Sequence, residues 1–240
     1  MKSVKKLNIY DEPHIQRFGS RMNSLRAAVL GSNDGIISTA GLVVGVAGAT
    51  SSAPALITAG VAGVVAGALS MAAGEFISVS SQRDVQKVQL ETERKQLETN
   101  PVEEFEELIQ MYQIKGLTRS TAEKVASELS KNDAFSAHVA IELNIDPTDL
   151  TNPWHAAIAS TLSFTIGAII PLVTIVLSPH SYKIINTFIA VVIALVITGS
   201  LSAQISGANK GKAILRVLIG GMLAMIITYA IGRLIGSSHL

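Results

Sequence analysis

The sequence predicts an all-α, polytopic membrane protein with five transmembrane helices and a cytoplasmic helical insert between helices 2 and 3. Hydrophobic residues make up 48% of the 240 residues and charged residues only 15%, whereas soluble domains contain about a quarter charged residues. The charges are also unevenly distributed, because fourteen of the eighteen acidic residues fall within residues 81–153. Two apolar regions therefore flank one acidic, water-exposed region.

Five apolar stretches are long enough to cross about 30 Å of hydrocarbon, a distance that takes roughly 20 helical residues. The third stretch contains no formal charge, and neither does the fourth from Ile184 onward. Arg216 and Arg233 lie near the two ends of the fifth, where long side chains reach the membrane interface. A count of four or six spans would require one re-entrant segment. The five stretches cover approximately residues 26–49, 54–80, 155–178, 183–206 and 213–235.

Basic residues near the span ends predict the orientation. They gather before the first span and again, as Lys210 and Lys212, after the fourth. The positive-inside rule therefore places the N-terminus and the insert in the cytoplasm, and an odd number of spans places Leu240 on the opposite side. The expected organisation is a cytoplasmic N-terminal segment 1–25, transmembrane helices 1 and 2 in 26–80, an acidic cytoplasmic domain 81–153, and transmembrane helices 3 to 5 in 154–240.

The first 24 residues are polar and lack the apolar core of a signal peptide. A short N-terminus without a targeting segment suits the cell membrane of a prokaryote, and a vacuolar membrane is the alternative location.

The sequence of the insert predicts a series of helices. The second span continues without a helix breaker to about Thr99, and Asn100–Pro101 begins a new helix because proline fits a first helical position. Ser120 with Glu123 predicts a capping box at the start of the next helix, and Asn132 is expected to cap a last helix. Four side chains at helical spacing predict one apolar face: Phe105, Leu108, Ile109 and Tyr112.

Several classes of function are disfavoured by what the sequence lacks. It contains no cysteine, which excludes disulfides and thiolate metal sites. No nucleophile elbow and no phosphate-binding glycine loop occur, so we predict neither an enzyme nor ATP-driven transport. Basic residues do not cluster on the charged region, which disfavours nucleic acid as a partner.

Polar residues within the first two spans are candidates for a transport path. Asp34 lies about two helical turns after Arg26, at a depth where a carboxylate is costly and usually faces a cavity or a partner. Gly35 and its polar neighbours predict an irregular or water-lined stretch here. Met71 and Glu75 lie one turn apart on the second span, and a thioether with carboxylates suits a borderline divalent metal such as Fe²⁺. A structural hydrogen bond of Asp34 and simple packing of Met71 are the alternatives.

The insert carries a second group of candidate ligands. Glu104, Glu107 and Met111 share one helix face at i, i+3 and i+7, and the i, i+4 spacing of His138 and Glu142 allows both to reach one ion. Carboxylates with an imidazole fit Fe²⁺, Mn²⁺ or Zn²⁺. Exposed helices are normally rich in glutamate, so a solvated helix surface is the alternative.

Three GxxxG pairs lie in the first two spans, at Gly31 and Gly35, at Gly41 and Gly45, and at Gly63 and Gly67. Such pairs let helix backbones pack closely in lipid. They predict helix packing within one subunit, and a homodimer seam is the alternative.

Two segments closely resemble the vacuolar iron transporter family: RAAVLGSNDGIIST at residues 26–39 and SMAAGEFISVSSQRD at residues 70–84. The resemblance extends over nearly the whole chain. It implies a homodimer that exchanges cytosolic Fe²⁺ or Mn²⁺ for protons, with a cytoplasmic metal-binding insert and a transport path at the dimer interface.

The same resemblance assigns roles to individual positions. The family's first-span aspartate matches Asp34 and its second-span methionine matches Met71, and both would line the path. This chain departs from the family at Gln96, where better-known members have another glutamate, and Glu98 lies nearby. It also has His138 with Val139 in place of a methionine pair. The glutamates of the family's insert fall on Glu93, Glu104, Glu107 and Glu142.

The sequence therefore predicts a divalent metal transporter for Fe²⁺ or Mn²⁺, with Zn²⁺ as a further cargo, that works as a proton antiporter moving metal out of the cytoplasm. Its expected partners are metal ions, protons, the lipid bilayer and a second copy of the chain, and no tightly bound cofactor is expected. One alternative is a membrane-anchored sensor or storage protein that binds metal without transport. Another is a scaffold whose insert docks a partner helix.

Overall fold

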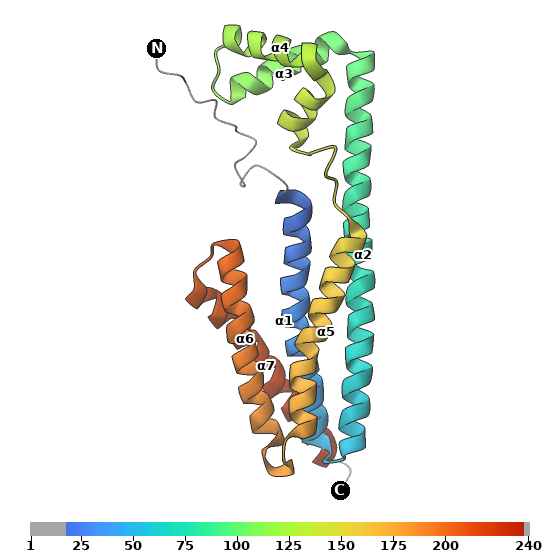
Figure 1. Ribbon diagram of the computed structural model, residues 1–240, viewed down its shortest axis with the longest axis vertical. Helices are drawn as coiled ribbons and strands as arrows, with labels where there is room; N and C mark the ends of the chain where they lie inside the picture. Colours follow the sequence, from blue (N-terminus) through green and yellow to red (C-terminus); the bar gives the residue numbers. More distant parts are fainter. Residues whose placement is uncertain (1–17, 238–240) are drawn as a thin grey trace, which may run out of the picture. The chain divides into compact units, whose positions relative to one another are not determined.

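The computed structural model describes the backbone of residues 18–237 and the side chains of residues 23–237. Helices are the only regular elements in this part of the chain (Figure 1). Most of the predicted N-terminal segment 1–25 lies outside the described residues, and so does Leu240. In chain order the elements are α1 (Phe18–Ala49), α2 (Ala53–Thr99), α3 (Pro101–Ile114), α4 (Arg119–His138), the π-helix η2 (Val139–Leu143), α5 (Pro153–Leu177), the short 3₁₀ helix η3 (His180–Tyr182), α6 (Lys183–Ser206) and α7 (Lys210–Ser237).

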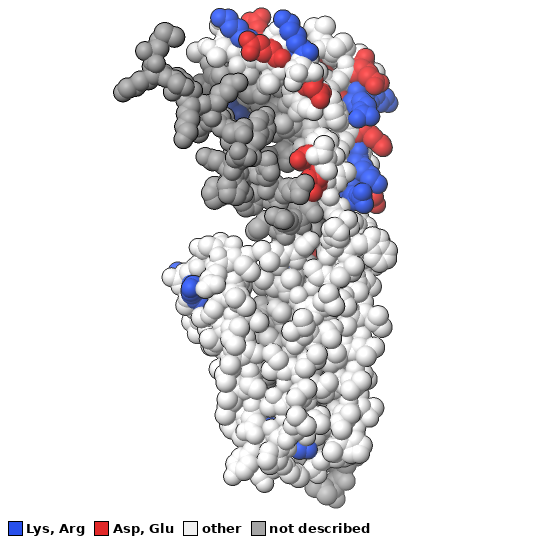
Figure 2. All heavy atoms as spheres, in the orientation of Figure 1, with Lys and Arg blue, Asp and Glu red and all other residues white. Residues whose placement is uncertain are grey.

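The described residues form two compact units. We call Ser78–Asn152 the insert unit, and we call Met22–Ile77 with the described residues from Pro153 onward the spanning unit. Helix α2 contributes its first part to the spanning unit and its last part to the insert unit. Lys, Arg, Asp and Glu side chains gather on the insert unit, whereas the visible face of the spanning unit carries few of them (Figure 2).

Five described helices are long and apolar enough to cross a membrane, namely α1 from Asn23, α2, α5, α6 together with η3, and α7. The predicted number of spans is therefore confirmed. Proline marks two of the helix starts, because α3 begins at Pro101 and α5 at Pro153.

The spanning unit is held together by two clusters of buried apolar side chains. The larger joins α1, α6 and α7, and the smaller joins α1, α2 and α5. Within lipid, tight van der Waals packing holds such helices together, because lipid chains are as apolar as the side chains. Helix α1 is common to both clusters and forms the centre of the unit. The fully buried members are Ile36, Ala40, Val44, Val191, Leu195 and Met225 in the larger cluster and Val43 and Ile175 in the smaller one.

Glycines on α1 lie directly against the backbones of two neighbouring helices. A Cβ atom at Gly31 would collide with the carbonyl oxygen of Ser160 on α5, and one at Gly35 would collide with that of Phe164. On the next turns, Gly45 lies against α7, where a Cβ atom at Gly232 would collide with the Gly45 carbonyl oxygen. These contacts support the predicted packing within one subunit.

Of the two possibilities predicted around Asp34, an irregular backbone or a water-lined stretch, the irregular backbone is wrong. Helix α1 is continuous from Phe18 to Ala49, and the Ser38 hydroxyl donates to the Asp34 carbonyl oxygen at 2.6 Å. The neighbouring glycines allow close approach of α5 and do not unwind the helix. A glycine within a span is compatible with an irregular backbone and also with a regular helix that a neighbouring helix approaches closely, because the missing side chain permits both.

We expect Gly35→Ala to lower the stability of the protein by about 1–3 kcal/mol, the usual cost of overpacking, because the added methyl group meets backbone atoms of α5 that cannot move independently. Thermal unfolding in detergent, followed by loss of the monodisperse fraction, measures this. Gly220→Ala is the matched control, since a Cβ atom there meets nothing within 4 Å. Equal melting temperatures for the two variants would contradict the close contact of α1 and α5.

In the insert unit, α3 and α4 pack against each other around Leu108, Ile109, Ala122 and Ala126. Phe105 and Tyr112 cover this cluster, which confirms the predicted apolar face of α3.

Two helix starts in the insert unit differ from the prediction. Thr118 caps α4, and its hydroxyl accepts from the Thr121 backbone N–H at 3.4 Å, so the box of Ser120 and Glu123 is wrong. The last helix is capped at Asp133 and not at Asn132. Asp133 has extended backbone angles inside α4 (φ −160°, ψ 97°), and its carboxylate accepts from the Ser136 N–H at 3.0 Å and the Ser136 hydroxyl at 2.6 Å. A kink at Asp133 therefore restarts the helix that carries His138.

Candidate metal centre and membrane cavity

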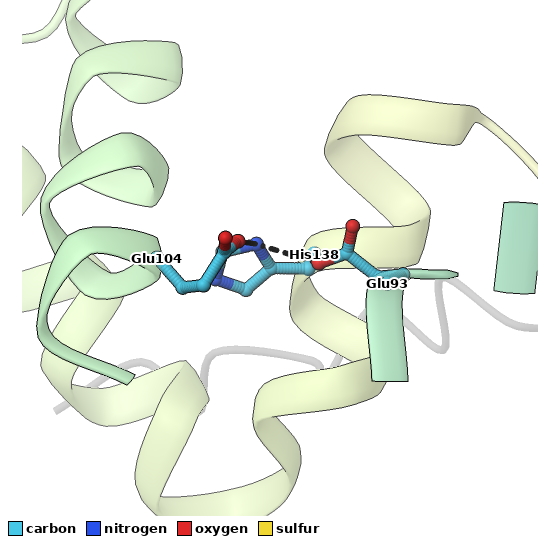
Figure 3. Close-up of side chains that lie close together, drawn as sticks. All are labelled: Glu93, Glu104 and His138. Carbon is cyan, nitrogen blue, oxygen red and sulfur yellow. Dashed lines mark ion pairs between the residues drawn. The ribbon is translucent and has the colours of Figure 1, made fainter. Parts of the chain in front are cut away.

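Three buried side chains from different helices meet in the insert unit. Glu93 comes from α2, Glu104 from α3 and His138 from the end of α4, and they point toward one another in Figure 3. One ligand atom from each lies within 4.8 Å of the others. His138 Nδ1 is 3.0 Å from Glu93 Oε1 and 3.7 Å from Glu104 Oε2. The exposed fractions are 2% for Glu93, 4% for Glu104 and 1% for His138. We call this group the Glu93–Glu104–His138 cluster.

The facing atoms of the cluster lack hydrogen bonds of suitable geometry. Within the described residues, Glu93 Oε1, Glu104 Oε2 and His138 Nδ1 are buried and have no such partner. Buried polar atoms are normally hydrogen-bonded, because leaving them unpaired is costly. Two carboxylate oxygens and an imidazole nitrogen are ligands that Fe²⁺, Mn²⁺ and Zn²⁺ accept. A divalent cation between the three side chains would therefore satisfy all three atoms at once.

Burial and mutual repulsion shift the proton affinities of the cluster. Burial, reinforced by the charge of Glu142 and a hydrogen bond to it, raises the pKa of Glu93 to about 7. Burial also raises the pKa of Glu104, with the charge of Glu107 as the next cause. Burial lowers the pKa of His138, although Glu142 and Glu107 oppose that shift. At neutral pH these side chains by themselves thus favour a neutral imidazole and a partly protonated Glu93, and a metal that binds must displace that proton.

The remaining predicted ligands of the insert occupy different positions. Glu107 is half-buried and Glu142 is exposed, and both lie close enough to raise the pKa of Glu93. Gln96 and Met111 are half-buried and Glu98 is exposed. The structure thus brings Glu93, Glu104 and His138 into one group and places Glu107 and Glu142 in its electrostatic surroundings.

Two local features of the backbone place His138. The kink at Asp133 precedes it by five residues, and the π-helix Val139–Leu143 follows it directly. Single π-helical turns occur frequently at functional sites. Sequence reasoning missed the role of Asp133, although an aspartate three residues before Ser136 has the spacing of an N-cap.

A second candidate site is a cavity of about 310 Å³ in the spanning unit. Asp34 and Ser38 of α1 line it together with Met71 of α2, and Phe164 of α5 also contributes. We call it the Asp34–Met71 cavity. Two residues far apart in sequence, a carboxylate and a thioether, are thus brought to one space. The full lining is Asp34, Ser38, Thr39, Leu42, Gly63, Gly67, Ser70, Met71 and Phe164.

Glu75, the third residue predicted for the path, is not part of the cavity lining. Its side chain is 9% exposed, and Glu75 Oε1 accepts a hydrogen bond from Arg26 Nη2 at 3.1 Å. Glu75 is therefore a buried carboxylate paired with a cation of α1.

Comparison with known proteins places the chain in a family. The VIT family matches residues 25–233. A vacuolar iron transporter of Acanthamoeba castellanii is 40% identical over 88% of this chain and 78% of its own length. Vacuolar iron transporter homolog 2 of Arabidopsis thaliana is 35% identical over 91% of this chain and 88% of its own length. VIT-like transporter 1b of Glycine max is 34% identical over 92% of this chain and 80% of its own length. The chain therefore belongs to the VIT family.

Proposed function

We propose that this protein transports divalent metal ions, Fe²⁺ or Mn²⁺, out of the cytoplasm in exchange for protons. The observation that carries the proposal is the Asp34–Met71 cavity, which places a carboxylate and a thioether together inside the spanning unit. The names of the relatives as vacuolar iron transporters support iron as the cargo. The protein acts as a carrier and not as an enzyme, and metal is its substrate.

Carboxylates serve both halves of such an exchange. An ionised carboxylate binds a divalent cation, and protonation removes that affinity. Asp34 therefore holds metal when its carboxylate is free and releases it when a proton arrives from the more acidic side. One carboxylate that cannot hold both cargoes at once couples their movements in opposite directions.

The insert unit has the role of a loading domain in this proposal. Basic residues at the span ends support a cytoplasmic location for it and for the N-terminus. The Glu93–Glu104–His138 cluster collects metal there, and Glu107 and Glu142 add negative charge around it. Gln96, Glu98 and Met111 are further ligand candidates at its edge. The imidazole of His138 makes Zn²⁺ an additional cargo, because zinc accepts nitrogen ligands readily.

We further propose that the protein works as a homodimer in the membrane of a prokaryotic cell or of a vacuole. The spanning part of α2 supports a dimer, because little of its surface is buried within the chain, as is also true of α7, whereas much of α1 is buried. A second copy packed on that surface would enclose the Asp34–Met71 cavity from the open side of α2.

Metal flux into proteoliposomes tests the transport proposal. With full-length protein and an acidic lumen, we expect Fe²⁺ kept reduced, or Mn²⁺, to enter vesicles as protons leave, and we expect a protonophore to abolish the gradient-driven part. Zn²⁺ measured in parallel defines the selectivity, and protein-free vesicles are the control.

Two other outcomes would point to the alternative functions. Metal binding without flux under any gradient favours a membrane-anchored sensor or storage protein. The absence of both binding and flux favours a scaffold that docks a partner through its insert.

A further inference from the structure

An ion pair joins the first two spans within the spanning unit. Arg26 Nη2 of α1 lies 3.1 Å from Glu75 Oε1 of α2, and the Arg26 guanidinium also donates to Asn23 Oδ1 at 3.0 Å from Nη2 and 3.3 Å from Nε. The two partners differ greatly in exposure, because the Arg26 side chain is 57% exposed and that of Glu75 is 9% exposed. A largely exposed cation thus covers a buried carboxylate.

The positions along both helices place this pair at one end of the Asp34–Met71 cavity. On α1, Arg26 precedes Asp34 by eight residues, about 12 Å of helix, and on α2 Glu75 follows Met71 by four residues, about 6 Å. The same two helices supply eight of the nine cavity-lining residues, and these run from Asp34 onward on α1 and up to Met71 on α2. The pair therefore lies on the side of the cavity that faces the N-terminal end of α1, which our proposed orientation makes the cytoplasmic side.

We propose that Arg26 is a tethered competitor for the cation site at Glu75. In the metal-free state its guanidinium neutralises the Glu75 carboxylate, and an incoming divalent metal must displace it before passing on to Met71 and Asp34. Arginine suits this role because it stays charged at all physiological pH values. The guanidinium is largely exposed and contacts Glu75 through Nη2 and Oε1, so little free energy is needed to displace it. This inference rests on the proposed transport function.

Substitutions of Arg26 and of Glu75 should therefore change the apparent affinity for metal in opposite directions. Removing the competitor in Arg26→Gln should lower the KM for Mn²⁺ by about two- to fivefold, the range expected for a solvent-accessible ion pair. Arg26→Lys retains the positive charge and should keep the KM near that of the wild type. Glu75→Gln removes the site and should raise the KM. Because Arg26 acts through Glu75, adding Arg26→Gln to Glu75→Gln should leave that raised KM unchanged.

Initial rates of Mn²⁺ flux in proteoliposomes, normalised to reconstituted protein, give KM and kcat for each variant. Arg216→Gln is the matched control, because it removes an exposed positive charge from a different helix of the same unit, near the start of α7. A fall in KM in this control equal to that in Arg26→Gln would assign the effect to general surface charge and overturn the proposal.

Other outcomes also distinguish a competitor for metal from an ion pair that only stabilises the fold. An ion pair that only stabilises the fold predicts that both single variants lose folded protein while their KM values stay unchanged or move together, and either result overturns the proposal. Should Glu75→Gln fail to fold, the comparison of Arg26→Gln with Arg26→Lys still decides it. A wild-type protein that moves no metal refutes the proposed transport function itself, which is a separate and recognisable result.

Discussion

Asp34→Asn should reduce metal flux by at least about 100-fold, because removing the charged partner of a desolvated cation costs about 3–5 kcal/mol. The substitution preserves the size and shape of the side chain and removes the charge from the Asp34–Met71 cavity. An asparagine can neither bind metal strongly nor carry a proton. Both the metal flux and the accompanying proton movement should therefore disappear, as measured by metal uptake and by a pH-sensitive dye in the same vesicles.

Two control variants separate loss of transport from loss of structure. Asp34→Glu keeps the charge and should retain part of the flux. Ser200→Ala removes a hydroxyl on α6 whose hydrogen bond goes to the Val196 carbonyl oxygen of the same helix, and it should transport normally. The melting temperature in detergent should be nearly the same for all three variants. Normal flux by Asp34→Asn would remove this carboxylate from the mechanism.

Glu93→Gln should abolish half or more of the stabilisation that metal gives to the protein. A ligand at 100 times its Kd stabilises the folded state by about 2.7 kcal/mol. Loss of an outer-shell partner already weakens metal binding by about 10- to 100-fold, so loss of one of the three direct ligands should weaken it by at least as much. The measurement is the shift in melting temperature of the full-length protein on addition of Mn²⁺ or Fe²⁺. Glu128→Gln removes an exposed carboxylate of α4 and is the control, with an unchanged shift expected.

The metal-free protein gives an independent test through its pH dependence. The pKa of Glu93 is raised from its usual 4.5 to about 7, so the folded state binds more protons than the unfolded state between these values. The contribution of Glu93 to stability is therefore greatest below pH 4.5 and is lost as the pH rises through about 7. The stability of metal-free Glu93→Gln should not fall in this way as the pH rises, and the variant should be at least as stable as the wild type at pH 8. Lower stability of the variant at that pH would contradict the shifted pKa.

The spans and the main helix boundaries could be predicted from the sequence because they depend on local properties. Apolar length defines a membrane span, and Pro101 marks a helix start wherever the helix packs. The start of α4 was predicted wrongly because Thr118, Ser120 and Thr121 all have hydroxyl groups that can cap. The choice between them depends on which residue adopts an extended backbone, and composition does not reveal that.

The candidate sites were harder to predict because their members meet through tertiary structure. Spacing on α3 grouped Glu104 with Glu107 and Met111, yet the ligand atoms that form a group with Glu104 come from α2 and α4. Resemblance to the family supplied Glu93, which spacing alone did not single out. The partnership of Arg26 with Glu75 spans 49 residues and left no local signal. Periodicity identifies residues on one helix face and carries no information about which face of another helix lies opposite.

The glycine contacts in the spanning unit are of two kinds, between two helix backbones and between a helix backbone and the end of a side chain. Contacts of α1 with α5 and α7 are made between backbones, so α1 cannot shift relative to either without breaking many atomic contacts at once. Gly63 and Gly67 of α2 instead contact the side-chain ends of Leu42 and Phe164, which can change rotamer. A shift of α2 along α1, α5 and α7 would therefore meet side chains and not backbones at these two glycines, and it would move Met71 relative to Asp34. In a carrier built this way, the metal site would open to one side of the membrane and then to the other through the sliding of one helix, and not through the rotation of two halves of the protein.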